Sequence, residues 1–138
     1  MSKPIAINKG IAFAFPDVCL TPIIVPVPIP YPNIALLNQA QDVAEDLLVG
    51  GDKVLLEGSY VTSSMGDEAG SVGGVKSGRF QGPCKITSAS SSVVYGPDKK
   101  GIARFMDTTA QNMVTEQASD GNAVGFVLSA FPTVLVGD

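Results

Sequence analysis

The hydrophobic pattern begins with a short alternation of large and small side chains at residues 11–15, Ile-Ala-Phe-Ala-Phe. In a β-strand this alternation places Ile11, Phe13 and Phe15 on one face. Pro16 follows directly. Because proline lacks the N–H that a strand ladder needs, we expect the strand to end there.

Six prolines then occupy residues 16–32, and four of them alternate with large apolar residues from Pro26 to Pro32. Alternating prolines fix every second φ and bias the residues between them to extended geometry. The segment is therefore predicted to be a stiff extended rod with Val27, Ile29 and Tyr31 facing one way. A flexible linker or a ligand for an aromatic groove is the alternative, but large apolar residues favour packed structure.

Further along, the pattern predicts short elements joined by turns. Residues 38–48 are the only segment predicted to be helical, with one to three turns. Three hairpins are expected, at residues 47–57, at residues 93–106, and from residues 125–128 back to residues 134–136. Residues 66–78 hold five glycines and are predicted to form an irregular loop. The fold class expected is mainly β, a single compact domain over residues 1–138 with at most one short helix.

The composition narrows the functions that such a domain could have. The chain has 138 residues, of which 45% are apolar and 16% charged, and its net charge is −4. Lys99 and Lys100 are the only basic pair, and they lie in a turn rich in Gly and Pro. Nucleic-acid binding needs clustered basic residues, so we expect none. The glycine loop departs from a phosphate-binding loop at Val75, so nucleotide binding is not expected either.

The chain contains no histidine, and this restricts its chemistry most. Histidine is the usual general base near neutral pH and the commonest metal ligand. We therefore expect no enzyme, no catalytic residue and no cofactor. The alternative is a small secreted toxin or hydrolase that uses the carboxylates of Asp67, Glu68 or Asp107. Those carboxylates are expected instead to cap turns.

Two cysteines, Cys19 and Cys84, are too few for a disulfide-rich scaffold or a four-cysteine zinc site. We expect two buried core thiols and no bound metal. A contact between the two cysteines, or a metal-ligand role for Cys19, are the alternatives. Five prolines interrupt the apolar residues 20–37, so no membrane span is expected there. The residues also give no pattern of an N-terminal secretion signal.

Four segments, in this order, resemble the PAAR-like tip domain family of bacterial contractile injection systems. They are FAFPDVC at residues 13–19 followed by Thr21-Pro22, PVPIPYPNIA at residues 26–35, SSMGDEAG at residues 63–70, and GIARFMDTT at residues 101–109. The resemblance extends from Phe13 to about Asn112, which is most of the chain.

The resemblance implies a cone-shaped domain that caps and sharpens a spike of type VI secretion or a related machine. The implied partner is a trimeric β-helical spike protein of the valine–glycine repeat (VgrG) type, with one copy of this chain per trimer. Effector cargo is a further possible partner, and a free-standing effector adaptor is an alternative role. The resemblance also implies assembly in the cytoplasm, followed by export at the tip of the machine.

Two departures from the family change the site expected. Metal-binding members hold zinc with His and Cys near the apex, whereas this chain has Phe105 after Arg104, where relatives often have histidine. A packed apolar apex is therefore expected in place of zinc.

The second departure is the unusually apolar segment before the proline run. The residues predicted to dock on the spike are Ile23, Ile24, Val25, Val27 and Ile29. Packing within the core of the chain itself is the alternative. Arg104 and Asp107 are expected to pair as a surface ion pair, which contributes little.

Overall fold

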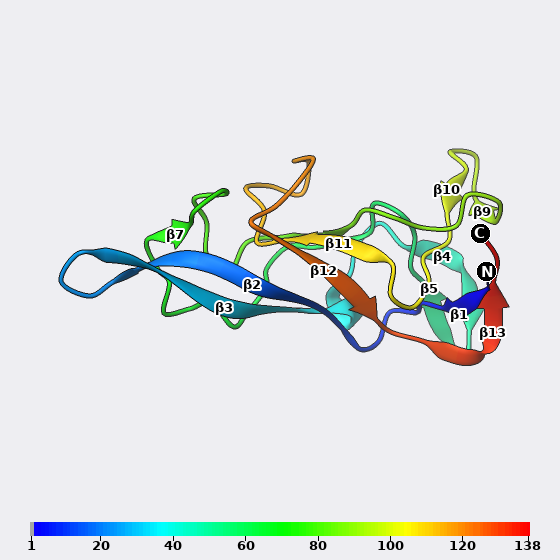
Figure 1. Ribbon diagram of the computed structural model, residues 1–138. Helices are drawn as coiled ribbons and strands as arrows, with labels where there is room; N and C mark the ends of the chain where they lie inside the picture. Colours follow the sequence, from blue (N-terminus) through cyan, green and yellow to red (C-terminus); the bar gives the residue numbers. More distant parts are fainter. Residues whose placement is uncertain (1) are drawn as a thin grey trace.

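The computed structural model describes residues 2–138 as an elongated β-structure with one wide end and one narrow end (Figure 1). Strands β1, β4, β5, β9, β10 and β13 lie at the wide end, and the turn between β2 and β3 forms the narrow tip. We call the wide end the base. The strands of the base are β1 (Lys3–Ile5), β4 (Ala44–Val49), β5 (Asp52–Val54), β9 (Val94–Tyr95), β10 (Lys100–Gly101) and β13 (Phe131–Val136).

The base strands pair as three antiparallel hairpin-like units, β1–β13, β4–β5 and β9–β10. The remaining strands form one larger sheet in the order β3-β2-β12-β11-β8-β6, with β7 paired to β2. Its strands are β2 (Ile11–Pro22), β3 (Pro26–Leu36), β6 (Tyr60–Val61), β7 (Gly73–Gly74), β8 (Cys84–Ile86), β11 (Thr108–Gln111) and β12 (Ala123–Leu128).

A closed ring of three backbone hydrogen bonds organises the base. The N–H of Ala6 donates to the carbonyl of Ala103 at 3.0 Å, and the N–H of Ala103 donates to Leu55 at 2.9 Å. The N–H of Leu55 completes the ring by donating to Ala6 at 3.1 Å. All three residues are fully buried. Three segments of the chain, 48 or 49 residues apart, therefore meet around a pseudo-three-fold axis.

The same symmetry extends outward from this ring. A second set of three hydrogen bonds surrounds the ring. In each, the donor N–H belongs to the residue two positions after a ring residue, and the acceptor carbonyl belongs to the residue two positions before the next ring residue around the axis. The donors are Asn8, Glu57 and Phe105, and the respective acceptors are Lys53, Gly101 and Pro4, at 2.9, 2.9 and 2.8 Å. In the next layer the N–H groups of Leu37, Ile86 and Val127 donate to the carbonyls of Gly10, Ser59 and Asp107. The base is thus a three-fold repeat within one chain.

Three strand pairs continue the repeat away from the base, and they close into a three-sided prism. Equivalent registers are Ala12↔Ala35 in β2–β3, Val61↔Cys84 in β6–β8 and Thr109↔Gly125 in β11–β12. Pairing of β12 with β2 and of β11 with β8 joins the sides. Isolated bridges, Ile34↔Met65 and Gln41↔Tyr60, join the third edge.

The interior changes character along the axis of the prism. Near the base it is apolar, and the side chains of Leu37, Ile86 and Val127 pack with the ring residues in one cluster. Toward the narrow end, the buried side chains become polar. They are Asp17, Asn33, Ser64, Asp67, Gln111, Asn112 and Asn122. The packed apolar apex predicted from the sequence is therefore wrong, because amide and carboxyl groups occupy that part of the interior.

The outward face of β2, β3 and β12 has the opposite character, because it carries no charged or polar side chain. We call it the outer face. Alternation along the strands and their registers assign it to Ile11, Phe13, Phe15, Val18, Leu20 and Pro22 of β2, to Pro26, Pro28, Pro30, Pro32, Ile34 and Leu36 of β3, and to Val124, Phe126 and Leu128 of β12.

The mainly-β expectation is confirmed, and so is the β4–β5 hairpin. The extended proline segment also forms as predicted, with Val27, Ile29 and Tyr31 half-buried on one face of β3. The predicted end of the first strand at Pro16 is wrong. β2 runs through this residue to Pro22, with a cis Phe15–Pro16 bond and a register shift between Ala14 and Asp17.

Two other element predictions are wrong. The predicted helix at residues 38–48 is reduced to a single 3₁₀ turn, Leu37–Gln39, because the following residues pair as β4 with β5. The third hairpin also fails, since β12 pairs with β2 and β11 while β13 pairs with β1. Within residues 2–138, no helix has both the length and the apolar character required to cross a bilayer.

Candidate functional site

The base presents three exposed aliphatic side chains at equivalent positions. Leu48, Val94 and Leu135 are 58%, 44% and 61% exposed. In the strand registers Leu48 lies opposite Lys53, Val94 opposite Gly101 and Leu135 opposite Pro4. Lys53, Gly101 and Pro4 are the three equivalent acceptors around the ring, so the pseudo-three-fold axis relates the residues opposite them as well. We call Leu48, Val94 and Leu135 the base triad.

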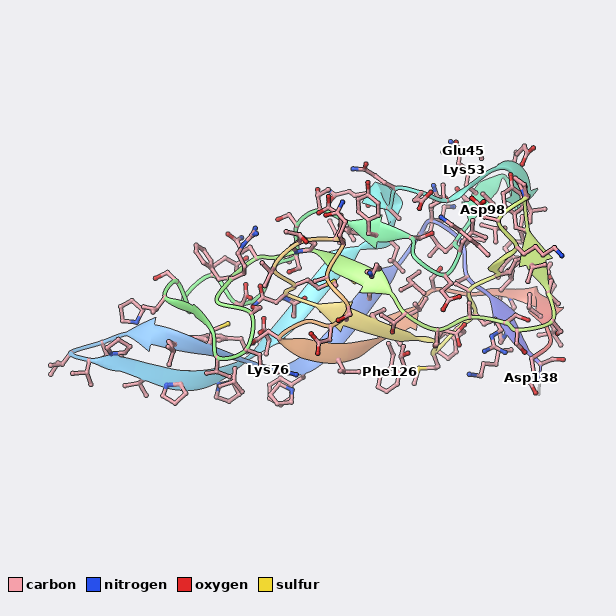
Figure 2. The ribbon with its side chains drawn as sticks, turned by 90° about the horizontal axis from the view of Figure 1, so that it is seen from above. Glu45, Lys53, Lys76, Asp98, Phe126 and Asp138 are labelled. Carbon is pink, nitrogen blue, oxygen red and sulfur yellow. The ribbon has the colours of Figure 1, made fainter. Side chains whose placement is uncertain are left out.

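Charged side chains lie at the same end of the molecule as the triad. Figure 2 shows Glu45, Lys53, Asp98 and Asp138 at the wide end of the molecule. Lys53 pairs with Glu45, and Lys100 pairs with Asp42 at 2.8 Å. An apolar centre with a polar rim is the usual composition of a protein interface.

The predicted pair of Arg104 and Asp107 forms, but the prediction that it lies on the surface is wrong. Both side chains are buried, and Nη2 of Arg104 lies 3.0 Å from Oδ1 of Asp107. The backbone N–H of Arg104 also donates to Oδ2 of Asp107 at 2.8 Å. Hydrogen bonding to Asp107 raises the pKa of Arg104 above its ordinary value. A buried charge that loses its partner destabilises the folded state, so this ion pair holds the turn at residues 104–107 in place.

The polar interior of the narrow half is centred on the carboxylate of Asp17. Nδ2 of Asn33 donates to Oδ2 of Asp17 at 3.1 Å, and Nδ2 of Asn112 donates to Oδ1 at 3.1 Å. Asn122 donates a third amide hydrogen bond to Oδ1. Together the three amides replace the water that would otherwise solvate a buried carboxylate.

The orientation of each amide follows from its other partners. Oδ1 of Asn112 accepts from the N–H of Gly82 at 2.9 Å, and Oδ1 of Asn122 accepts from the N–H of Lys76 at 2.8 Å. Oδ1 of Asn33 accepts from Nε2 of Gln111 at 2.7 Å. Since each oxygen already faces a donor, each NH₂ group must face Asp17.

Asp67 and Cys19 complete this cluster. Burial, with the neighbouring Asp17 as a further cause, raises the pKa of Asp67 to about 7. Burial and the two carboxyls raise the pKa of Cys19 to about 12, so its thiol stays protonated at neutral pH. Burial likewise raises the pKa of Cys84 to about 12. Both cysteines are buried free thiols, as predicted from the sequence.

Asp17, Cys19 and Asp67 each offer a ligand atom, and these atoms lie within 4.8 Å of one another, which is close enough to suggest a metal site. The donor set does not fit a cation well. Three amide N–H groups point at the oxygens of Asp17, and a metal ion would have to displace them. A proton held between the two carboxyls explains the same proximity without displacing any donor.

The structure separates the residues that the sequence predicted for docking. Ile23, Ile24 and Val25 lie in the β2–β3 turn and are 65%, 97% and 63% exposed. Val27 and Ile29 are half-buried on the inward face, opposite Thr21 and Cys19. This turn is at the opposite end of the molecule from the base (Figure 1). Docking through these five residues remains a prediction.

The carboxylates considered for catalysis have structural partners. Asp67 is buried and accepts from the N–H of Gln81 at 3.0 Å. Glu68 is exposed and accepts from the N–H of Gly66, and backbone hydrogen bonds lower its pKa. Asp107 is held by Arg104.

Sequence reasoning missed both the base triad and the buried amides. A signal was present only for the ring, as a repeat, IAINKG at residues 5–10, VLLEGS at residues 54–59 and IARFMD at residues 102–107. These segments share only a β-like apolar start, so their equivalence becomes clear only from the hydrogen-bonded ring.

Comparison with known proteins agrees with this architecture. The family model described as the toxin PAAR-like domain matches residues 10–118. The chain therefore belongs to the toxin PAAR-like domain family. It is also 36% identical over 113 residues to the DNase toxin Tse7 of Pseudomonas aeruginosa. The match covers 76% of this chain but only 28% of that protein. No solved structure matches significantly.

Proposed function

We propose that this protein caps the trimeric β-helical spike of a bacterial contractile injection system, of type VI or a related type. The observation that carries the proposal is the hydrogen-bonded ring of Ala6, Leu55 and Ala103. It gives a single chain a base with three equivalent sides. Such a base is the shape that one monomer needs in order to fit the end of a three-fold symmetric partner.

We assign the docking contact to the base triad. A trimer presents each of its surface features three times, and Leu48, Val94 and Leu135 offer three matched apolar side chains. Binding one chain uses all three positions, so the expected stoichiometry is one copy per trimer. In this arrangement the β2–β3 turn points away from the spike (Figure 1).

The test is to mix the full chain with its trimeric spike and to measure the mass of the complex by light scattering. The expected mass is that of one trimer plus one copy of this chain. Leu48→Asp and Leu135→Asp are each expected to weaken binding by tenfold or more, because each places a charge in an apolar contact (roughly 2 kcal/mol). The matched control is Ile24→Asp, also exposed but at the other end.

The outcomes separate the two candidate docking ends. If Ile24→Asp abolishes binding while the base variants bind normally, the contact lies at the β2–β3 turn, as the sequence first suggested. If the wild-type chain forms no complex, the proposal fails altogether. Thermal unfolding of each variant must match that of the wild-type chain, because only then does lost binding report on the contact.

A toxic enzyme is the second candidate, and the similarity to a DNase toxin favours it. We propose that this chain is not itself the enzyme. It has no histidine, it spans about a quarter of that relative, and Asp67 and Asp107 are buried. Incubation of the purified chain with plasmid DNA is expected to leave the DNA intact. Cleavage that disappears in the Asp107→Asn variant would favour the enzyme instead.

A further inference from the structure

The end of the β2–β3 hairpin has uncharged side chains and exposes apolar ones at its turn. Residues 18–32 contain no charged side chain. At the turn, Ile23, Ile24 and Val25 are among the most exposed large apolar side chains of the described chain, and Ile24 is almost completely exposed. Water opposes such exposure, so a three-residue aliphatic tip indicates a binding surface.

Polar groups of the hairpin pair with one another. The hydroxyls of Thr21 and Tyr31 lie 2.7 Å apart and form a hydrogen bond. The thiol of Cys19 is buried against Asp17 and Asp67. The side chains of the hairpin therefore leave no hydrogen-bonding group that an apolar medium would strand.

The free edge of β3 lacks backbone donors. The N–H and the carbonyl of Ile34 both face away from β2, because they pair with Met65 at 2.8 Å. Alternation then directs the backbone of every second residue, Pro26, Pro28, Pro30 and Pro32, toward the same free edge. Prolines have no N–H, so at these positions the free edge presents carbonyl acceptors and no donor. The same feature prevents the edge from accepting a further strand from a protein partner.

We infer that the β2–β3 turn inserts into the hydrocarbon of a lipid bilayer. The turn is a convex tip, and a protein partner would need a pocket to enclose it. A bilayer needs no such complementarity, and the side chains of the turn bring no charge and no unpaired hydrogen-bonding group into it. The apolar outer face continues from the tip along Leu20, Pro22 and Pro28. This binding goes beyond capping the spike and does not depend on it.

The test uses the full chain and vesicles of zwitterionic phosphatidylcholine. The wild-type chain is expected to float with the vesicles, and binding should not depend on salt, because the chain is acidic and the lipid has no net charge. The double variant Ile23→Ser with Ile24→Ser is expected to bind at least about tenfold more weakly, since two aliphatic side chains leave the hydrocarbon. Leu48→Ser with Leu135→Ser is the matched control at the base and should bind like the wild type.

A second measurement reports depth. The chain has no tryptophan, so Ile24→Trp creates a single reporter. Its emission is expected to shift to shorter wavelength on vesicle binding and to be quenched by brominated lipid, whereas Leu48→Trp should show neither effect.

Three results would overturn the inference. They are a wild-type chain that does not float, equal quenching of the two reporters, and turn variants that lose the spike complex while still binding vesicles. The last result would make the turn a protein contact. Failure of spike binding with intact, turn-dependent vesicle binding would instead count against the proposed function alone.

Discussion

The base and the narrow half of this molecule differ in where their polar and apolar side chains lie. The base has an apolar interior around the ring of Ala6, Leu55 and Ala103, and it has charged side chains on its rim. The narrow half has amides and carboxyls inside, and its outer face is entirely apolar. The base therefore has the usual distribution of apolar and charged side chains, whereas the narrow half combines a polar interior with one apolar outer face.

Symmetry separates the halves as well. The base repeats the same hydrogen bonds three times, whereas among residues 2–138 the shell of amides around one carboxylate is found once, at Asp17. The ring position one residue beyond Leu55 is Leu56, and its equivalents are Ile7 and Arg104. Even at the base, then, the repeat has diverged where Arg104 pairs with Asp107. The three-fold repeat thus extends from the base into the prism and is lost in the polar interior of the narrow half.

The largest expected effect comes from Asp17→Ala in the narrow half. It leaves three buried amide groups without their acceptor, and we expect a loss of about 3–5 kcal/mol in the free energy of unfolding. Urea unfolding measures this loss. Asp52→Ala at the base serves as control, since Asp52 is only half-buried and pairs with the exposed Lys9 at 3.1 Å. A loss below about 1 kcal/mol for Asp17→Ala would show that the amide shell is dispensable.

The two free thiols sharpen this result, because Cys19 lies in the narrow half and Cys84 in the core near the base. Asp17→Ala is expected to speed alkylation of Cys19 in the native protein and to leave Cys84 protected. Equal labelling of both thiols would mean that the halves unfold as one unit.

Leu55→Ala is the corresponding change at the base, with an expected cost of about 3 kcal/mol for the cavity that it creates. Leu55 is fully buried at the ring, and its backbone bonds do not involve the side chain. Here Cys84 should become the more reactive thiol. If Cys19 reacts first in this variant too, the contrast drawn between the halves is wrong.

Only part of the fold could be predicted from the sequence, because the contacts that form the base join residues far apart in the chain. The β4–β5 hairpin follows from Gly50-Gly51 between apolar residues, and the extended proline strand follows from the fixed φ of its prolines. The ring could not be predicted, since it joins backbone groups about 48 residues apart whose side chains differ. The false helix at residues 38–48 shows tertiary pairing overriding local periodicity.

The candidate sites were harder to predict. The base triad consists of ordinary aliphatic residues, and only the register shows that they are equivalent. Nothing in the sequence marked the buried amides, because amide side chains are usually exposed and only the structure shows their partners. These residues are Asn33, Gln111, Asn112 and Asn122. Exposure of Ile23 and Ile24 could not be inferred either, since large aliphatic residues are usually buried.

A smaller effect is expected from pH. The pKa of Asp67 is raised from 3.8 to about 7, so between these pH values the folded protein holds a proton that the unfolded chain has released. The stability that this proton provides is therefore complete below the lower value and is lost as the pH rises through the higher one. Asp67→Asn mimics the protonated carboxyl and keeps an acceptor for the N–H of Gln81.

Unfolding midpoints at about pH 5 and about pH 8 give the measurement. The wild type is expected to lose stability over this interval more steeply than Asp67→Asn. Parallel curves for the two proteins would exclude Asp67 as the titrating group.

The smallest effect on stability is expected from Pro28→Ala on the outer face, about 0.5–1 kcal/mol from the greater freedom of the unfolded chain. The informative readout is self-association, because alanine restores a backbone donor to the free edge of β3. Size-exclusion chromatography should show concentration-dependent dimers for Pro28→Ala and none for the wild type. A monomeric variant would mean that the prolines serve rigidity rather than edge protection.

The ring at the base also dictates when this protein can acquire its shape. No two of the segments around Ala6, Leu55 and Ala103 complete the cycle, so the structure cannot close until the ribosome has delivered the third. Until then, aliphatic side chains from the first two segments have no permanent neighbours. Contacts between such distant parts of a chain form slowly, so we expect a late, single-step collapse.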